Sequence, residues 1–128
     1  MAEIDLEWRR LGRTDMKTRA LGQGCALFES QGVTDEDAYE GVRRASDLGL
    51  NFVDTSPLYG DSERRVGLAL EDGYRERVYL QTKTGTHPER RQDYSADATR
   101  WSVENSLRLL KTDRFDSVLI HAPQDIGA

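Results

Sequence analysis

The sequence is poor in several residue types and patterns, and each shortage excludes a class of protein. Cysteine occurs once, at Cys25, so the chain forms no internal disulfide, which fits a reducing compartment. No stretch approaches the roughly 20 consecutive apolar residues of a membrane-spanning helix. The first residues, MAEIDLEW, have neither the basic start nor the apolar run of a secretory signal. We therefore expect a soluble protein located in the cytoplasm.

The sequence also lacks an excess of positive charge and a metal-ligand pattern. Lysine and arginine total 18 against 23 acidic residues, which gives a net charge of −5. No overall positive field is therefore available to attract nucleic acid or an anionic membrane. The two histidines, His87 and His121, show no paired spacing and predict no metal site. His87 lies in a polar stretch, where we expect it to be solvated.

What the sequence does contain is an alternation of helix patterns and short apolar strands. Thr34, with Asp37 three residues later, predicts a capped helix start, and Gly49 predicts its end. Further helices are predicted to begin at Ser62 and at Ser95. Their apolar stripes are Ala38, Val42, Ala45 and Leu48, then Val66, Ala69 and Leu70, then Val103, Leu107 and Leu110. The strands they lead to are expected at 50–54, 77–83 and 115–121, after an earlier strand that ends at Gly24.

This order predicts an α/β fold with a parallel sheet, since each strand-to-strand repeat has the size of one βα unit. Spacing alone leaves a closed barrel and an open doubly wound sheet as alternatives. A dinucleotide-binding glycine fingerprint starting at Gly22 would need its third glycine where Leu27 stands, so the fingerprint fails and the barrel is favoured. Residues 8–10 and 16–19 also predict a short hairpin able to close the bottom of a barrel.

Polar residues follow the predicted strands at the point where each one ends. Asp54 closes the first full strand and Tyr59 lies in the loop after it, while Lys83 and His121 close the next two strands. The C-terminal ends of parallel strands in a βα fold all face one way. These four residues are therefore expected to form one site.

The segments NFVDTSPLYGDSE, QTK and LIHAP, in that order, resemble the aldo-keto reductase family. The opening stretch WRRLGRTDMKTRALGQGC is similar to the family's N-terminal hairpin and first strand. Within the family, the sequence around FVDTSPLYG is most similar to the branch that oxidises aldoses such as galactose and fucose. The resemblance implies a (β/α)8 TIM barrel, NADP(H) as cofactor with NAD as the alternative, and a small carbonyl or sugar substrate.

The resemblance also assigns Asp54, Tyr59, Lys83 and His121 to the family's catalytic tetrad. Tyr59 is the candidate general acid, and because a free phenol titrates near 10, it needs a nearby cation. Lys83 is expected to supply that charge, with Asp54 as its partner. His121 is expected to hydrogen-bond the substrate carbonyl and orient it. Gly24, Cys25 and Asp54 are the expected contacts to the nicotinamide end of the cofactor.

Each of these residues has a simpler explanation when taken alone. Asp54 can start a turn, Tyr59 can be a surface residue, Lys83 can face solvent, and His121 can be a core histidine. Their joint occurrence at three successive strand ends favours the catalytic interpretation. Cys25 has no adjacent basic group to activate its thiol, so it is not expected to be a nucleophile.

The length of the chain limits what it is expected to do. A complete barrel needs about 250 residues, so the 128 residues are expected to be the N-terminal half of a barrel domain, with about four strands and three helices. Phosphate sites in barrels generally follow the last two strands, so the isolated chain is expected to be inactive. The alternative is a truncated, non-enzymatic remnant that acts as a binding or cofactor-sensing module. Open strand edges would favour self-association in either case.

Overall fold

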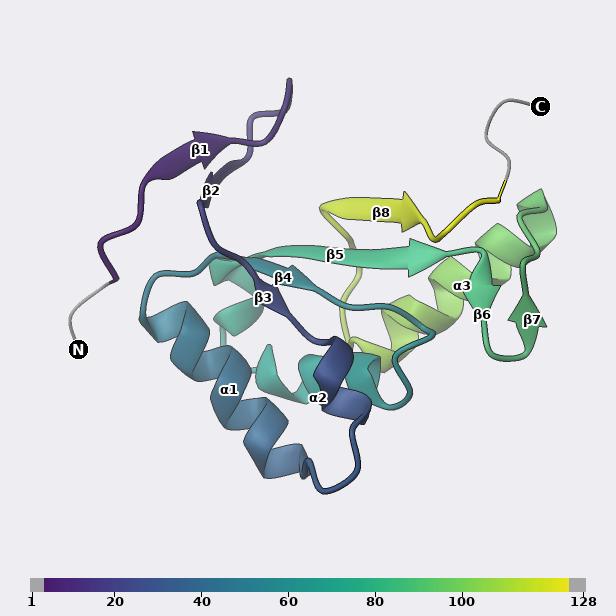
Figure 1. Cartoon of the computed structure of the whole chain (residues 1–128), viewed down its shortest axis with the longest axis horizontal. Helices are drawn as coiled ribbons and strands as arrows, with labels where there is room; N and C mark the ends of the chain where they lie inside the picture. The colour runs from purple at the N-terminus through teal and green to yellow at the C-terminus, as the bar shows by residue number, and fades with distance from the viewer. Residues whose placement is uncertain (1–3, 125–128) are drawn as a thin grey trace.

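A computed structural model describes residues 4–124 of the chain. A small hairpin comes first along the chain, and the strands of a parallel sheet then alternate with helices (Figure 1). The strands are β1 (Trp8–Arg10), β2 (Lys17–Arg19), β3 (Gln23–Gly24), β4 (Phe52–Asp54), β5 (Tyr79–Thr84), β6 (Thr86–His87), β7 (Arg90–Arg91) and β8 (Ser117–Ile120). The α-helices are α1 (Asp35–Asp47), α2 (Ser62–Ala69) and α3 (Ala96–Leu109), and the 3-10 helices are η1 (Ala26–Glu29) and η2 (Tyr74–Arg77). None of the helices in this range is long and apolar enough to cross a membrane.

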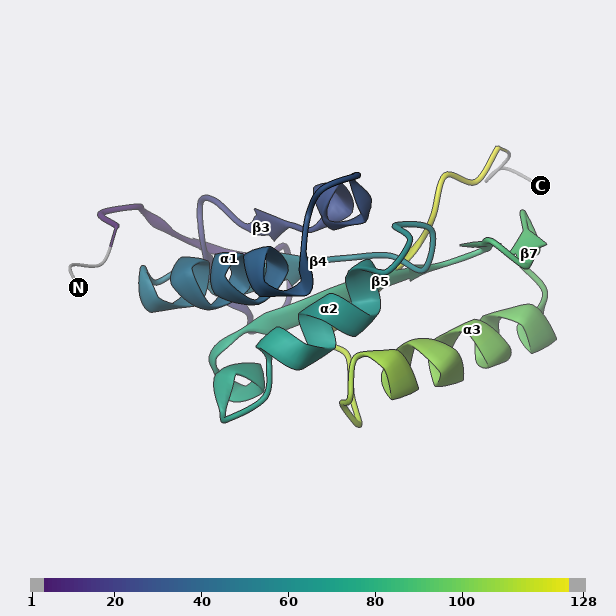
Figure 2. The ribbon, with the colours of Figure 1, turned by 90° about the horizontal axis from the view of Figure 1, so that it is seen from below.

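The central sheet contains β3, β4, β5 and β8 in that spatial order, and all neighbouring strands are parallel. The strands thus follow their order in the sequence, whereas a doubly wound sheet reverses its order at a switch point. The helices α1, α2 and α3 lie along one side of the sheet (Figure 2). Both features are those of a barrel wall and support the barrel over the doubly wound alternative.

The helix boundaries have local causes. The side chain of Thr34 accepts a hydrogen bond from the Asp37 amide, and the Asp37 carboxylate accepts one from the Thr34 amide, which confirms the capping box at the start of α1. Gly49 follows α1 with a φ of 96°, in the left-handed region that glycine adopts without strain. Ser95 caps α3 by accepting from the Ala98 amide.

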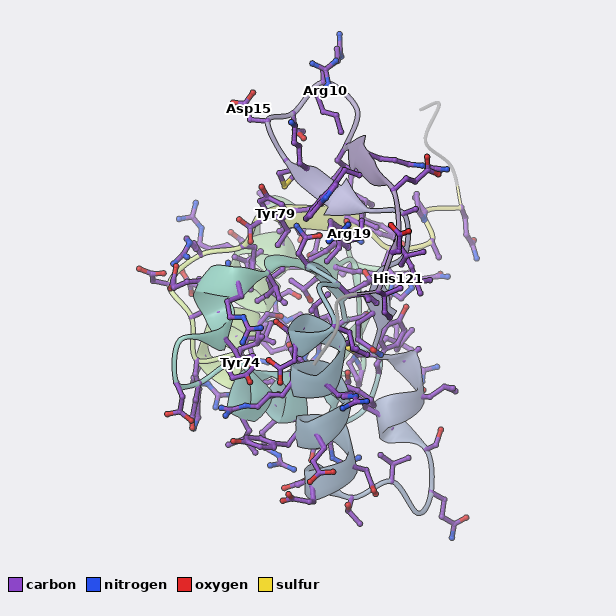
Figure 3. All side chains as sticks on the ribbon, turned by 90° about the vertical axis from the view of Figure 1, so that its left-hand side faces the viewer. Arg10, Asp15, Arg19, Tyr74, Tyr79 and His121 are labelled. Carbon is purple, nitrogen blue, oxygen red and sulfur yellow. The ribbon has the colours of Figure 1, made fainter. Side chains whose placement is uncertain are left out.

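The β1–β2 hairpin is antiparallel, as predicted, and projects away from the helices, with Arg10 and Asp15 toward its tip (Figure 3). The side chain of Asn51 accepts from the Arg19 amide and donates to the Lys17 carbonyl oxygen, which ties β2 to the start of β4. The hairpin therefore lies at the N-terminal end of the sheet, opposite the strand ends that carry the predicted site.

The core lies between the sheet and the helices. Its buried members are Cys25, Val42, Val53, Val66, Ala69, Leu70, Val78, Leu80 and Leu110. The stripe predicted for α3 was only partly right: Val103 and Leu107 are half-buried, and α3 buries small residues instead. The end of α3 approaches α2 closely, since a Cβ on Gly67 of α2 would lie 2.5 Å from the carbonyl oxygen of Leu109.

Two further elements differ from the sequence prediction. Residues 74–77 form η2, whose Arg75 is buried and donates to the Asp116 carboxylate at 2.9 Å, joining η2 to the start of β8. The polar stretch after β5, for which no strands were predicted, forms the antiparallel β6–β7 hairpin. His87 is only partly solvated, since it is half-buried. Its ring lies edge-on to Trp101 with centroids 4.4 Å apart, and burial lowers the His87 pKa.

Candidate active site

The four residues of the predicted tetrad meet at the C-terminal edge of the sheet. Asp54 is the last residue of β4, Lys83 lies in β5, and His121 follows β8 directly. Tyr59 comes from the loop between β4 and α2. Because β4, β5 and β8 are adjacent and parallel, residues that are far apart in the sequence lie side by side at this edge.

Lys83 is the centre of the cluster. Its ammonium donates to both carboxylate oxygens of Asp54 at 2.7 Å and to the carbonyl oxygen of Thr55 at 2.8 Å. The Lys83 side chain is only 8% exposed. The side-chain amide of Gln81 also donates, through Nε2, to Asp54 Oδ1 at 2.7 Å, so the carboxylate is held from two sides. A buried lysine is thereby paired with a carboxylate and fixed in position.

Tyr59 lies over this cation. The Lys83 ammonium nitrogen is 4.7 Å from the centroid of the Tyr59 ring, within the range of a cation–π contact. The Tyr59 ring also meets the His121 ring edge-on, with centroids 5.9 Å apart. Tyr59 lies in a short turn. In this turn the Tyr59 backbone amide donates to the Ser56 carbonyl oxygen, and the Ser62 backbone amide donates to the Tyr59 carbonyl oxygen.

His121 is held through both its backbone and its ring. Its amide donates to the carbonyl oxygen of Thr84 at 2.9 Å. Its ring nitrogen Nδ1 lies 2.6 Å from the hydroxyl of Thr86 and 3.2 Å from that of Ser56. Burial, and then the positive charge of Lys83, lowers the His121 pKa below its usual value of 6.5. The lowered pKa favours the neutral imidazole, which is able to donate or accept a hydrogen bond.

Several supporting residues were not found from the sequence. The Tyr94 ring packs against Gly85 so closely that a Cβ on Gly85 would lie 2.1 Å from Tyr94 Cε1. The Tyr94 hydroxyl donates to the His121 carbonyl oxygen at 3.0 Å. Gly85 has a φ of 97°, so both its conformation and its missing side chain are required at this turn. The glycine two residues after the predicted lysine was the one available signal. Gln81 and Thr86 gave none, because their partners are set by strand pairing.

The predicted cofactor contacts lie next to the tetrad but differ in exposure. Gly24 pairs with Asp54 across the sheet, is exposed, and has no atom within 4 Å of where its Cβ would be. Cys25 donates its amide to the Asp54 carbonyl oxygen, but its side chain is 0% exposed. Burial raises the Cys25 pKa, which agrees with the expectation that it is not a nucleophile. Any contact of Cys25 with a cofactor is thus limited to its backbone.

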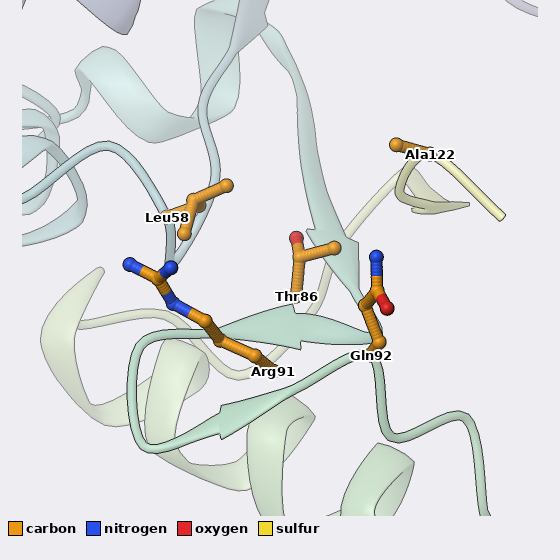
Figure 4. A pocket seen from close by; sticks show the side chains of 5 residues that line it. All are labelled: Leu58, Thr86, Arg91, Gln92 and Ala122. Carbon is orange, nitrogen blue, oxygen red and sulfur yellow. The ribbon is translucent and has the colours of Figure 1, made fainter. Parts of the chain in front are cut away.

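A hollow of about 700 Å³ opens beside these residues (Figure 4). Its lining residues are Leu58, Thr86, Arg91, Gln92 and Ala122. Leu58 and Ala122 are the sequence neighbours of Tyr59 and His121, and the other three come from the β6–β7 hairpin and the residue after it. The hollow therefore adjoins the tetrad. Among residues 4–124, no group of three or more His, Cys, Asp or Glu side chains is placed to hold a metal ion.

Comparison with known proteins decides the family. A family model described as the aldo/keto reductase family matches residues 20–126. The chain belongs to the aldo/keto reductase family. This aldo/keto reductase chain is 38% identical to L-galactose dehydrogenase of Arabidopsis thaliana over 91% of its own length, and it spans 38% of that relative. The resemblance stated from the sequence motifs is confirmed.

Solved structures agree with this assignment. The aldo/keto reductase chain is similar to a putative aldo-keto reductase of Pseudomonas aeruginosa with a TM-score of 0.82 and 41% identity, over 90% of this chain and 45% of that one. It is also similar to an aldo-keto reductase of Klebsiella pneumoniae in complex with NADPH, with a TM-score of 0.73 and 32% identity, over 86% of this chain and 37% of that one. The predicted fold class, the N-terminal portion of a barrel of this family, is confirmed.

Proposed function

We propose that the protein carrying this chain is an NADP(H)-dependent oxidoreductase that interconverts carbonyl and hydroxyl groups of small substrates such as aldoses. The observation that carries the proposal is the position of the Lys83 ammonium, paired with Asp54 on one side and lying against the Tyr59 ring on the other. In this arrangement Tyr59 is the general acid in reduction and the general base in oxidation. Family membership and the NADPH complex of the Klebsiella pneumoniae relative support it.

The residues at the end of β3 fit a nicotinamide ring. The space above Gly24 is open, and Asp54 lies directly beside it in the sheet register, so a flat ring has room next to the tetrad. A bound nicotinamide supplies or accepts the hydride. We propose that Gly24, the backbone of Cys25 and Asp54 form this nicotinamide edge of the site.

The chain's own residues then manage the proton and the carbonyl. During reduction Tyr59 donates its hydroxyl proton to the developing alkoxide, and the phenolate that forms is stabilised by the Lys83 cation. Asp54 holds Lys83 in place through two hydrogen bonds. The neutral His121 ring donates a hydrogen bond to the same carbonyl oxygen and orients it for attack.

The hollow beside the tetrad favours a polar, hydroxyl-rich substrate. Thr86, Gln92 and Arg91 line it with a hydroxyl, an amide and a guanidinium, which are partners for sugar hydroxyls. Leu58 and Ala122 supply apolar surface for the carbon skeleton. The 38% identity to L-galactose dehydrogenase supports an aldose rather than a hydrophobic aldehyde. We propose the cytoplasm as the site of action.

The alternative is a non-enzymatic binding or cofactor-sensing module that assembles through the edge of its sheet. One observation favours it: Val118, Leu119 and Ile120 of the outer strand β8 are 42%, 42% and 63% exposed. An apolar strand with a free edge readily pairs with another strand. Self-association through β8 is compatible with both functions, so oligomeric state alone does not decide between them.

Activity in a complete barrel distinguishes the two functions. In a suitable chimera, this chain replaces the corresponding segment of the Pseudomonas aeruginosa relative, of which it covers 45%. The assay follows formation of NADPH from NADP⁺ at saturating L-galactose, with the parent relative as control for the second half of the barrel. We expect turnover of L-galactose or another aldose. A folded chimera that binds NADP⁺ but oxidises no aldose and reduces no aldehyde would favour the binding module.

A further inference from the structure

Two hydroxyl groups converge on one nitrogen of the His121 ring. Thr86 Oγ1 lies 2.6 Å from Nδ1 and Ser56 Oγ lies 3.2 Å from the same atom. Thr86 comes from β6 and Ser56 from the loop after β4, so two separate segments supply them. A neutral imidazole carries its single ring proton on one nitrogen or the other, and the partner of one nitrogen sets the tautomer.

The hydrogen bonding of Ser56 favours one direction for its hydrogen bond with His121. Its Oγ already accepts a hydrogen bond from the Leu58 amide at 3.1 Å. Its own proton is then free to be donated, and Nδ1 is the acceptor within reach. A proton on Nδ1 would instead face the Ser56 hydroxyl, whose own proton would then have no other acceptor within residues 4–124. The single lone pair of Nδ1 accepts from the nearer Thr86 hydroxyl and can be shared with Ser56, whereas an N–H at this position would leave both hydroxyl protons without an acceptor among the hydrogen bonds within residues 4–124.

We propose that Thr86 and Ser56 are positioning residues that hold His121 in the tautomer protonated at Nε2. Nδ1 is then an acceptor on the protein side, and Nε2–H is a donor available to the substrate side of the ring. If the chain acts as proposed above, on which this step rests, the ring is already set to donate a hydrogen bond to the substrate carbonyl oxygen. The enzyme thus avoids changing the tautomer during each turnover.

The surroundings of the ring support a neutral, fixed imidazole. The charged groups that act on it are Lys83 from β5, whose cation disfavours a second ring proton, and Asp54 from β4, which acts in the opposite sense. Burial is the larger influence and lowers the His121 pKa. Tyr59 packs edge-on against the ring, and the Thr84 carbonyl oxygen holds the His121 backbone. These contacts already hold the ring and the backbone in place. The two hydroxyls therefore determine which ring nitrogen carries the proton.

Nitrogen-15 NMR of the 128-residue chain reads the tautomer directly and needs no turnover. The chain has two histidines, so each ring can be assigned. His87 is an internal reference, because its Nδ1 accepts a hydrogen bond from the Glu89 amide at 3.1 Å and is thereby also unprotonated. At pH 7.5 we expect both rings to show an unprotonated Nδ1 and a protonated Nε2. A protonated Nδ1 in His121 would overturn the proposal.

Variants separate tautomer control from a structural role. Combined Thr86→Val and Ser56→Ala substitutions should turn the single His121 tautomer into a mixture and leave the His87 signals unmoved. Thr86→Ser with Ser56 intact should keep the single tautomer. Thr84→Val is the matched control, since the buried Thr84 hydroxyl has no hydrogen-bond partner within residues 4–124 and lies two residues from Thr86. An unchanged His121 tautomer in the double variant would refute the assignment. Because no step of catalysis is measured, that outcome differs from a failure of the proposed enzyme function.

Discussion

Removing Asp54 should destabilise the chain more than removing its partner Lys83. In Asp54→Ala the Lys83 ammonium, on a side chain 8% exposed, keeps one acceptor within residues 4–124, the Thr55 carbonyl oxygen. Breaking a buried ion pair from one side costs about 3–5 kcal/mol, and we expect about 2–3 kcal/mol here because water reaches the partly exposed carboxylate position. In Lys83→Met, Asp54 retains the Gln81 amide and its 27% exposure to water, so the cost should be about 1 kcal/mol.

Urea unfolding of the 128-residue chain, followed by tryptophan fluorescence, measures both costs. A difference of about 1.5 kcal/mol corresponds to a midpoint shift of about 1 M between the two variants. Glu76→Ala is the control for a surface ion pair, because the Glu76 side chain is 67% exposed beside Arg114, and it should change the midpoint little. Equal midpoints for Asp54→Ala and Lys83→Met, or a less stable Lys83→Met, would refute the view that Lys83 is the buried member that depends on Asp54.

Three further outcomes are expected. Burial raises the pKa of Glu63 above its ordinary value of 4.5, so the folded chain holds this proton more tightly than the unfolded chain, and its contribution to stability is lost as pH rises through the folded-state pKa. Glu63→Gln should remove that part of the pH dependence in urea titrations between pH 4 and 8, and an identical slope in the variant would contradict it. Gly67→Ala should lower the free energy of unfolding by roughly 1–3 kcal/mol, because its Cβ would lie 2.5 Å from the Leu109 carbonyl oxygen. Gly41→Ala is the control: its Cβ would lie 3.8 Å from the Phe28 ring, so it should be neutral or stabilising. Thermal melts measure both variants. The 128-residue chain alone should bind NADPH weakly or not at all, since it spans only 37% of the NADPH-bound relative, and saturable micromolar quenching of Trp8 and Trp101 fluorescence would show otherwise.

The parts of the fold that were predictable from the sequence are those that local chemistry determines. The capping box of Thr34 and Asp37, the cap at Ser95 and the left-handed Gly49 each involve residues a few positions apart. Hydrophobic spacing placed the core residues of α1 and α2 for the same reason. The stripe of α3 was only partly right because burial along α3 depends on contacts between distant segments, such as the close approach of Gly67 in α2 to the end of α3.

The candidate site divides in the same way. Strand ends indicated Asp54, Lys83 and His121, because parallel topology alone brings strand ends together. The residues that hold them were not predictable: the Gln81 contact to Asp54 and the Thr86 contact to His121 depend on strand register and on the β6–β7 hairpin. The buried Arg75 and its partner at the start of β8 were missed for the same reason, since the pair is 41 residues apart in the sequence.

The most direct measurement of the central claim is the single-turnover rate of hydride transfer in the chimera, with Tyr59 and with Tyr59→Phe. Phenylalanine keeps the ring that lies over Lys83 and removes only the hydroxyl that exchanges the proton. We predict a rate loss of the order of 10² to 10⁴, typical of a lost general acid or base, with the dissociation constant of NADP⁺ nearly unchanged. Equal rates for the two proteins at saturating aldose would contradict the assignment of Tyr59 and of the site built around it.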